Sequence, residues 1–176
     1  MDDELAKMFD LENARDFYAK LLAEFDDFMG DQSSARHAMN CAITAHHMYD
    51  WVWVDFLRDD VALRARLGIG NRLSEFASWC EEKSAWFAVV QQISNGTKHF
   101  IRKNAESFEE IGGFGGGGFG QGPFGESYLA LDMQTEHVRY LPLSHIFEAV
   151  VRFWRDILIE CGHGADLPSG RTKLSA

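Results

Sequence analysis

The sequence predicts a mainly α-helical protein: a single-domain helical bundle with a C-terminal β-hairpin and a long Gly/Phe-rich loop. Three observations favour this fold class. Apolar residues recur every three or four positions through the first hundred residues, which is the helical repeat. Glycine then dominates residues 112–125, and two β-rich runs follow within residues 127–143. The length fits one domain, which we place at residues 1–165, followed by a loose tail at 166–176.

The expected helix boundaries follow from the apolar repeat and from residues that commonly cap helices. The expected helices cover about 11–29, 34–57, 60–67, 72–94 (one broken helix or two consecutive ones) and 145–161. Asp10 is expected to cap the first helix, Ser33 or Ser34 the second, and Ser144 the last. Small residues along the second helix predict that a neighbouring helix approaches it closely.

The stretch GGFGGGGFGQGPFG at residues 112–125 predicts a loop, because its phenylalanines are five positions apart, which matches neither the helical nor the strand repeat. Glycine loses more backbone freedom on ordering than any other residue. We therefore expect the loop's phenylalanines to be its buried residues: Phe114, Phe119 and Phe124. In the hairpin that follows, Pro142 restricts the second strand to a sheet edge.

Composition and charge exclude several classes of protein. The chain has 17 basic and 27 acidic residues, a net charge of −10, and 46% hydrophobic residues, which are enough to form a core. No run approaches the ~18–20 apolar residues of a membrane span, and the acidic N-terminus lacks the apolar centre of a secretory signal. Cys41, Cys80 and Cys161 form no CxxC pair. They indicate buried thiols in a reducing compartment, so we expect a cytoplasmic protein without a membrane partner.

The charge is unevenly distributed along the chain. Residues 1–31 hold ten acidic and three basic residues, which indicate either a solvated helix face or an acidic surface that docks a protein partner. Basic residues, in contrast, are grouped at Lys98, His99, Arg102 and Lys103. An acidic protein is a poor nonspecific binder of nucleic acid, because phosphate contacts supply most of that affinity. A small basic pocket could still hold one phosphate or one RNA loop.

The segment AHHMYDWVW at residues 45–53 contains the first candidate site residues. His46 and Asp50 are four positions apart and share a helix face. The helix around them is apolar nearly all round, which predicts that it is the most buried helix and that His46 and Asp50 are enclosed and hydrogen-bonded. We expect Asn95 or His99 as a partner. The residues alone leave open whether these are structural hydrogen bonds or a polar pocket.

The segment QQISNGTKHFIRK at residues 91–103 contains the second set of candidates. If the helix continues past Gly96, then Asn95, His99 and Arg102 lie on one face. That face either meets water or meets the polar edge of the second helix. In the latter case a site with two histidines, a carboxylate, an amide and an arginine results.

These two segments carry a family resemblance. NCAITAHHMYDWVWVDF at 40–56, followed by ISNGTKHF at 93–100, resembles an uncharacterised group of bacterial helical proteins. More distantly, the order of helices is similar to HEPN-type domains, many of which are RNA-cleaving toxins and defence proteins. Their mark is an arginine, usually followed by a polar residue, with a histidine four to six positions further on. Arg139 and His145 have that spacing, whereas Tyr140 follows the arginine.

The resemblance implies a HEPN-like RNA- or nucleotide-binding protein of bacterial defence or toxin type with no cofactor, and it leaves open whether the protein is an enzyme. The reaction, if there is one, is metal-independent RNA cleavage. In that reaction His99 would be the acid/base, Arg102 would bind the phosphate, and the sugar 2′-hydroxyl would be the nucleophile. The expected site consists of His99, His46 and Asp50 as catalytic residues and Asn95, Lys98 and Arg102 as substrate-binding residues.

Two other functions remain open from the residues. The first is a noncatalytic protein–protein interaction module, or a homodimer, that uses the acidic first helix and the Gly/Phe loop. The second is a helical bundle that binds Zn or Fe through His46, Asp50 and His99, since two imidazoles and a carboxylate suit these metals.

Overall fold

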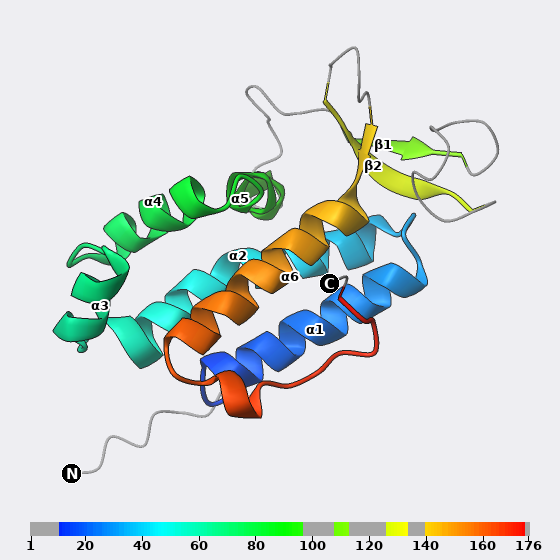
Figure 1. The fold of residues 1–176 in the computed structure, drawn as a ribbon. Helices are drawn as coiled ribbons and strands as arrows, with labels where there is room; N and C mark the ends of the chain where they lie inside the picture. Colours follow the sequence, from blue (N-terminus) through cyan, green and yellow to red (C-terminus); the bar gives the residue numbers. More distant parts are fainter. Residues whose placement is uncertain (1–10, 97–107, 113–125, 134–139, 175–176) are drawn as a thin grey trace, which may run out of the picture.

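The computed structural model describes residues 11–96, 108–112, 126–133 and 140–174 (Figure 1). Within them the chain is mainly helical, with a small antiparallel sheet, as the sequence predicts. The helices are α1 (Ala14–Gly30), α2 (Ala35–Val52), the π-helix η1 (Trp53–Leu57), α3 (Val61–Leu67), α4 (Leu73–Lys83), α5 (Phe87–Gly96), α6 (Leu143–Glu160) and the 3₁₀-helix η2 (Gly164–Asp166). The strands are β1 (Phe108–Ile111), β2 (Tyr128–Asp132) and β3 (Tyr140–Pro142).

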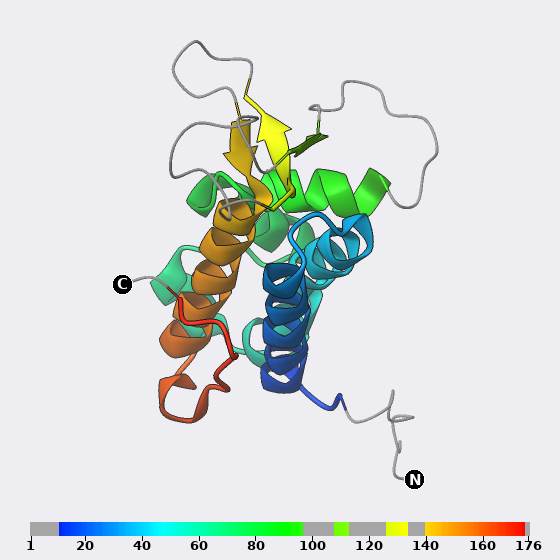
Figure 2. The ribbon, with the colours of Figure 1, turned by 90° about the vertical axis from the view of Figure 1, so that its right-hand side faces the viewer.

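Helix α2 occupies the centre of the arrangement and contacts α1, α4, α5 and α6. Helices α1, α2 and α6 lie side by side along their length, whereas α4 and α5 cover another side of α2 (Figures 1 and 2). The sheet lies at the end of the bundle where α6 begins, and α3 lies at the opposite end (Figure 1). This arrangement places His46 of α2 against Ser94 of α5.

Capping residues define most helix ends, although not always the expected ones. Asn13 caps α1, because its Oδ1 accepts the N–H groups of residues 15 and 16 at 2.9 and 3.0 Å. The expected cap, Asp10, lies outside the described residues. Ser34 caps α2 as predicted. The expected cap of the last helix, Ser144, is wrong: Pro142 ends β3, its fixed φ suits a helix start, and α6 begins at the next residue.

The second expected helix is α2 followed directly by η1. The N–H of Arg58 donates to the carbonyl of Trp53 at 2.7 Å, five residues back, which defines the π-turn. Arg64 of α3 is 7% exposed and donates from Nη1 to the carbonyls of Leu57 and Arg58. The guanidinium therefore satisfies carbonyl groups at the end of the π-turn and joins α3 to η1.

The prediction that the second expected helix, which consists of α2 and η1, is the most buried helix is wrong. Nine of the 18 residues of α6 are buried, compared with ten of the 23 residues of α2 and η1. On one face of these two helices, Val54 of η1 is exposed, and Trp51 of α2 is only half-buried beneath the ring of Phe17. Helix α6, in contrast, packs against α1, α2 and the sheet.

The predicted hairpin is confirmed, since β2 and β3 pair antiparallel and β3 with Pro142 is an edge strand. Strand β1 was not expected; it pairs with β2 from Phe108 opposite Leu131 to Ile111 opposite Tyr128. The N–H of Leu129 donates to the carbonyl of Gln32 at 2.9 Å, which attaches the sheet to the turn between α1 and α2.

The prediction for the phenylalanines of the glycine-rich loop concerns residues outside the described part of the chain: Phe114, Phe119 and Phe124. The expectation of a loose tail from residue 166 is wrong for the described residues. Leu167 and Leu174 pack against the core, and backbone N–H groups of the tail bind a carboxylate of α1. We call residues 164–174 the strap.

Candidate functional site

Polar and aromatic side chains gather where α2 packs against α5. We call this group the α2–α5 cluster: His46, His47, Tyr49, Asp50, Phe87 and Ser94. Successive residues of α2 point in directions about 100° apart, so residues 46–50 cover both the face against α5 and the adjoining surface. The ring of His46 stacks on that of Tyr49 with centroids 5.2 Å apart and lies 5.1 Å from that of His47.

His46 is enclosed, as the sequence predicts. It is 6% exposed, and its Nδ1 lies 3.2 Å from Oγ of Ser94, which is itself fully buried. Of the two expected partners, Asn95 has an exposed side chain one position further along α5, and His99 lies outside the described residues. The His46–Ser94 pair is therefore buried between the two helices and is not open to a large ligand.

Asp50 is not enclosed, so this prediction is wrong. Its side chain is 39% exposed, and its Oδ2 lies 3.2 Å from Nδ1 of His47. Asp50 comes four positions after His46 and is therefore rotated by about 40° around the helix from it. Because of this rotation, α5 covers the ring of His46 but not the carboxylate of Asp50. Burial, and after it the charge of Asp50, raises the pKa of Tyr49.

The half-exposed His47–Asp50 pair is the part of the cluster that a ligand can reach. An imidazole held by a carboxylate is a common arrangement for moving a proton or for binding an anionic oxygen. The sequence interpretation paired Asp50 with His46 on one helix face and missed the pair that Asp50 forms with His47. The three-residue spacing of His47 and Asp50 could have indicated the pair, because residues three apart on a helix are neighbours.

Among the described residues no group of three or more His, Cys, Asp or Glu side chains is arranged to hold a metal ion. The carboxylate of Asp50 pairs with His47 instead of lying beside the ring of His46. His99, the third member of the expected metal site, is outside the described part of the chain.

The acidic residues of α1 are largely engaged within the protein. Asp26 is buried and accepts N–H groups of the strap, Glu24 pairs with Lys20 at 2.9 Å, and Asp16 accepts the N–H of Glu12. These contacts leave less of the acidic charge of this helix for a protein partner than the sequence suggests.

A hollow that was not expected from the sequence lies between η1, α3 and the end of α6. It is open, has a volume of about 600 Å³, and is lined by residues that include Asp55, Asp59, Asp60, Cys161 and His163. The carboxylate of Asp55 accepts the N–H of the first residue of α1. Burial raises the pKa of Cys161 to about 11, so its thiol is protonated at neutral pH. The lining residues offer no activated nucleophile.

Comparisons of the chain with known protein families, curated proteins and solved structures found no match. The HEPN-like interpretation therefore stays a prediction from sequence. In the part of the chain that the structure describes, no helix combines the length and the apolar character needed to cross a bilayer.

The exposure of Asp50 leads to a prediction about stability. We expect Asp50→Ala to lower the free energy of unfolding by at most about 1 kcal/mol, because exposed ion pairs contribute little. His46→Ala should cost more, about 1–3 kcal/mol, since it removes a buried ring and its hydrogen bond to Ser94. Urea unfolding followed by circular dichroism measures both. Equal losses in the two variants would contradict the assignment of Asp50 to the surface.

Proposed function

We propose that this chain is a HEPN-like RNA- or nucleotide-binding protein of bacterial defence or toxin type, acting in the cytoplasm, and that it binds a phosphate group beside the α2–α5 cluster. The observation that carries the proposal is the half-exposed His47–Asp50 pair, which lies on the same helix as His46, itself hydrogen-bonded to Ser94 of α5. The His47–Asp50 pair is open to solvent, whereas the supporting His46–Ser94 pair is buried.

The sequence that follows α5 supports a phosphate ligand. Lys98, His99 and Arg102 come two, three and six positions after Gly96, the last residue of α5. Asn95 presents an exposed amide on the last turn of this helix. Cationic and amide groups near an imidazole are the chemistry that binds a phosphate ester.

RNA cleavage without a metal is the reaction that this set of groups would perform. The 2′-hydroxyl attacks the adjacent phosphorus, the bond to the 5′-oxygen breaks, and the leaving oxygen takes a proton. In the proposal His99 moves the protons and Arg102 holds the phosphate. The structural positions revise the roles of the other two expected catalytic residues: His46 positions α2 against α5, and Asp50 orients His47.

Fluorescence anisotropy with a labelled single-stranded RNA, and separately with a labelled adenine nucleotide, tests the proposal. Arg102→Ala should weaken binding by roughly tenfold or more, as loss of a charged contact to phosphate does. Arg58→Ala is the matched control, because it removes the same charge from an exposed side chain that lies beyond α2, directly after η1. It should change the affinity by less than about twofold. Incubation of the RNA in EDTA, followed by electrophoresis, measures cleavage.

Equal weakening by the two substitutions would mean that binding is only the attraction of a polyanion to net charge, and would contradict a site. Failure of the wild-type protein to bind either ligand would overturn the proposal. The interaction module and the homodimer would then be tested by sedimentation, and the metal site by elemental analysis of the purified protein.

A further inference from the structure

Asp26 of α1 is a buried acid with an unusual set of partners. It is 8% exposed, and its two carboxylate oxygens accept the backbone N–H groups of Arg171 and Thr172, each at 2.6 Å. Nε of Arg171 lies 3.6 Å from the same carboxylate. One side chain of the first helix therefore holds two consecutive peptide groups of the strap.

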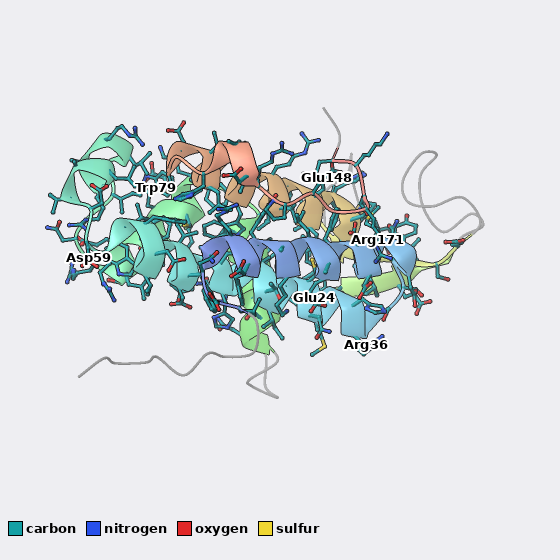
Figure 3. All side chains as sticks on the ribbon, turned by 90° about the horizontal axis from the view of Figure 1, so that it is seen from below. Glu24, Arg36, Asp59, Trp79, Glu148 and Arg171 are labelled. Carbon is teal, nitrogen blue, oxygen red and sulfur yellow. The ribbon has the colours of Figure 1, made fainter. Side chains whose placement is uncertain are left out.

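The strap follows α1 from its first turn to its last (Figures 1 and 3). At the start of the helix, Arg15 donates to the carbonyl of Asp166 at 2.7 Å. At the end of the helix, Arg171 pairs with Asp27 at 3.0 Å. Between these two points half-buried Leu167 packs against the core, and η2 of the strap contacts α6. Polar contacts thus hold the strap to α1 at both ends of that helix.

Two glycines shape the path of the strap. Gly162 has a φ of +91°, a left-handed conformation that reverses the chain direction directly after α6. Gly170 lies so close to Asp26 that a Cβ atom there would be 3.2 Å from a carboxylate oxygen. The first glycine permits a hinge, and the second permits the close approach of the strap to the carboxylate.

We propose that the strap is a hinged latch: residues 164–174 open as one unit about Gly162 while the helical bundle stays folded, and the carboxylate of Asp26 keeps the latch shut. Opening would expose the side of α1 that carries Asp26, together with the leucines of the strap. Opening breaks the contacts of the strap with α1 and of η2 with α6. It leaves the hydrogen bonds within α1, α2 and α6 in place, because the strap contributes none of them.

The charged groups around Asp26 determine how the latch responds to pH. Arg171 faces Asp26 from the strap, and Asp27 is next to it on α1. On α6, which packs against α1, Glu148 and Arg152 pair with each other at 3.0 Å, and Arg171 is the charge that acts on Asp26. Burial alone would raise the pKa of Asp26, but the hydrogen bonds from Thr172 and Arg171 hold this pKa below its usual value.

Because the pKa of Asp26 is lower in the closed state than in the open state, the carboxylate favours closure at neutral pH. This contribution is lost as the pH falls through the pKa of the closed state, when the carboxyl becomes protonated. The latch is therefore closed at neutral pH, and acid or removal of the Asp26 charge opens it.

Hydrogen–deuterium exchange of the full chain at neutral pH, read by mass spectrometry, tests the latch. Asp26→Asn should speed exchange in residues 165–174 by roughly tenfold or more, with α2 and α6 unchanged. Asp27→Asn is the matched control: it removes the same charge from an exposed neighbour that binds the strap only through a side chain. It should speed exchange by less than about threefold. Gly170→Ala, whose Cβ would lie 3.2 Å from the carboxylate, should speed exchange of the strap in the same direction but by less.

Unchanged exchange of the strap in both Asp26→Asn and Gly170→Ala would overturn the proposal, because the apolar contacts alone would then hold the strap. Faster exchange throughout α1 and α6 would also overturn it, since the strap would not open separately. In the wild-type protein, the exchange rate of the strap divided by that of the helices should be higher in acid than at neutral pH. An equal ratio of the two rates in acid and at neutral pH contradicts the latch.

Discussion

Replacing Trp154 with alanine should destabilise the protein by about 3–5 kcal/mol, the usual cost of removing a fully buried large aromatic side chain. Trp154 has no exposed surface and lies where α6 meets α2 and α5. Its ring contacts those of Phe76, Phe87 and Phe153 at centroid distances of 6.4, 5.9 and 4.9 Å. Its Nε1–H donates to the carbonyl of Ala45 at 2.8 Å.

Two further substitutions separate the contributions of Trp154. Trp154→Phe keeps a buried ring and loses the hydrogen bond to Ala45, so we expect a cost of about 1–2 kcal/mol. Trp51→Ala is the control for loss of a tryptophan from the surface, because Trp51 is half-buried and stacks on Phe17 at 4.8 Å. It should cost about 1 kcal/mol. Guanidinium unfolding followed by circular dichroism measures all three, and a loss for Trp154→Ala no larger than for Trp51→Ala would refute the prediction.

Replacing Arg64 with alanine should cost about 3 kcal/mol, because a buried carbonyl that loses its donor costs about 1–3 kcal/mol. The guanidinium donates to the carbonyls of Leu57 and Arg58 and lies 5.7 Å from the ring of Trp53. Lysine cannot form the same fork of donors, so Arg64→Lys should recover only part of the loss. Urea unfolding gives the free energies, and amide exchange in residues 53–58 reports on the π-turn itself.

Arg66→Ala provides the control on the same helix. Arg66 is exposed and donates to the carbonyl of Glu160 at 2.5 Å, so its loss should cost no more than about 1 kcal/mol. If Arg64→Ala and Arg66→Ala destabilise the protein equally, the guanidinium of Arg64 does not support the end of η1.

The helices could be predicted because their signals are local. Ser34 begins α2, and Gly68 ends α3 in the left-handed conformation that glycine adopts easily. Strand β1 escaped prediction because FEEI is only four residues long and its pairing with β2 depends on a partner that follows it by about 20 residues. The strap could not be predicted for another reason. Its backbone N–H groups bind Asp26, and backbone donors leave no pattern in a sequence.

The candidate site could be predicted only in part. The enclosure of His46 followed from the apolar surroundings in its helix, since a polar side chain among apolar ones is buried with them. The exposure of Asp50 could not be predicted, because it depends on the angle at which α5 crosses α2. The spacing of His47 and Asp50 was visible, but spacing alone does not tell which of two neighbouring histidines faces solvent.

The π-helix η1 has a consequence for how this chain tolerates changes in length. A π-turn holds one residue more than an α-turn of the same rise, so removing one residue there restores the ordinary helical repeat. Val54 is exposed within η1, and its loss would remove no buried side chain. Deletion of one residue is therefore more easily absorbed in η1 than in α2 or α6, where it would turn every later side chain by about 100° away from its contacts.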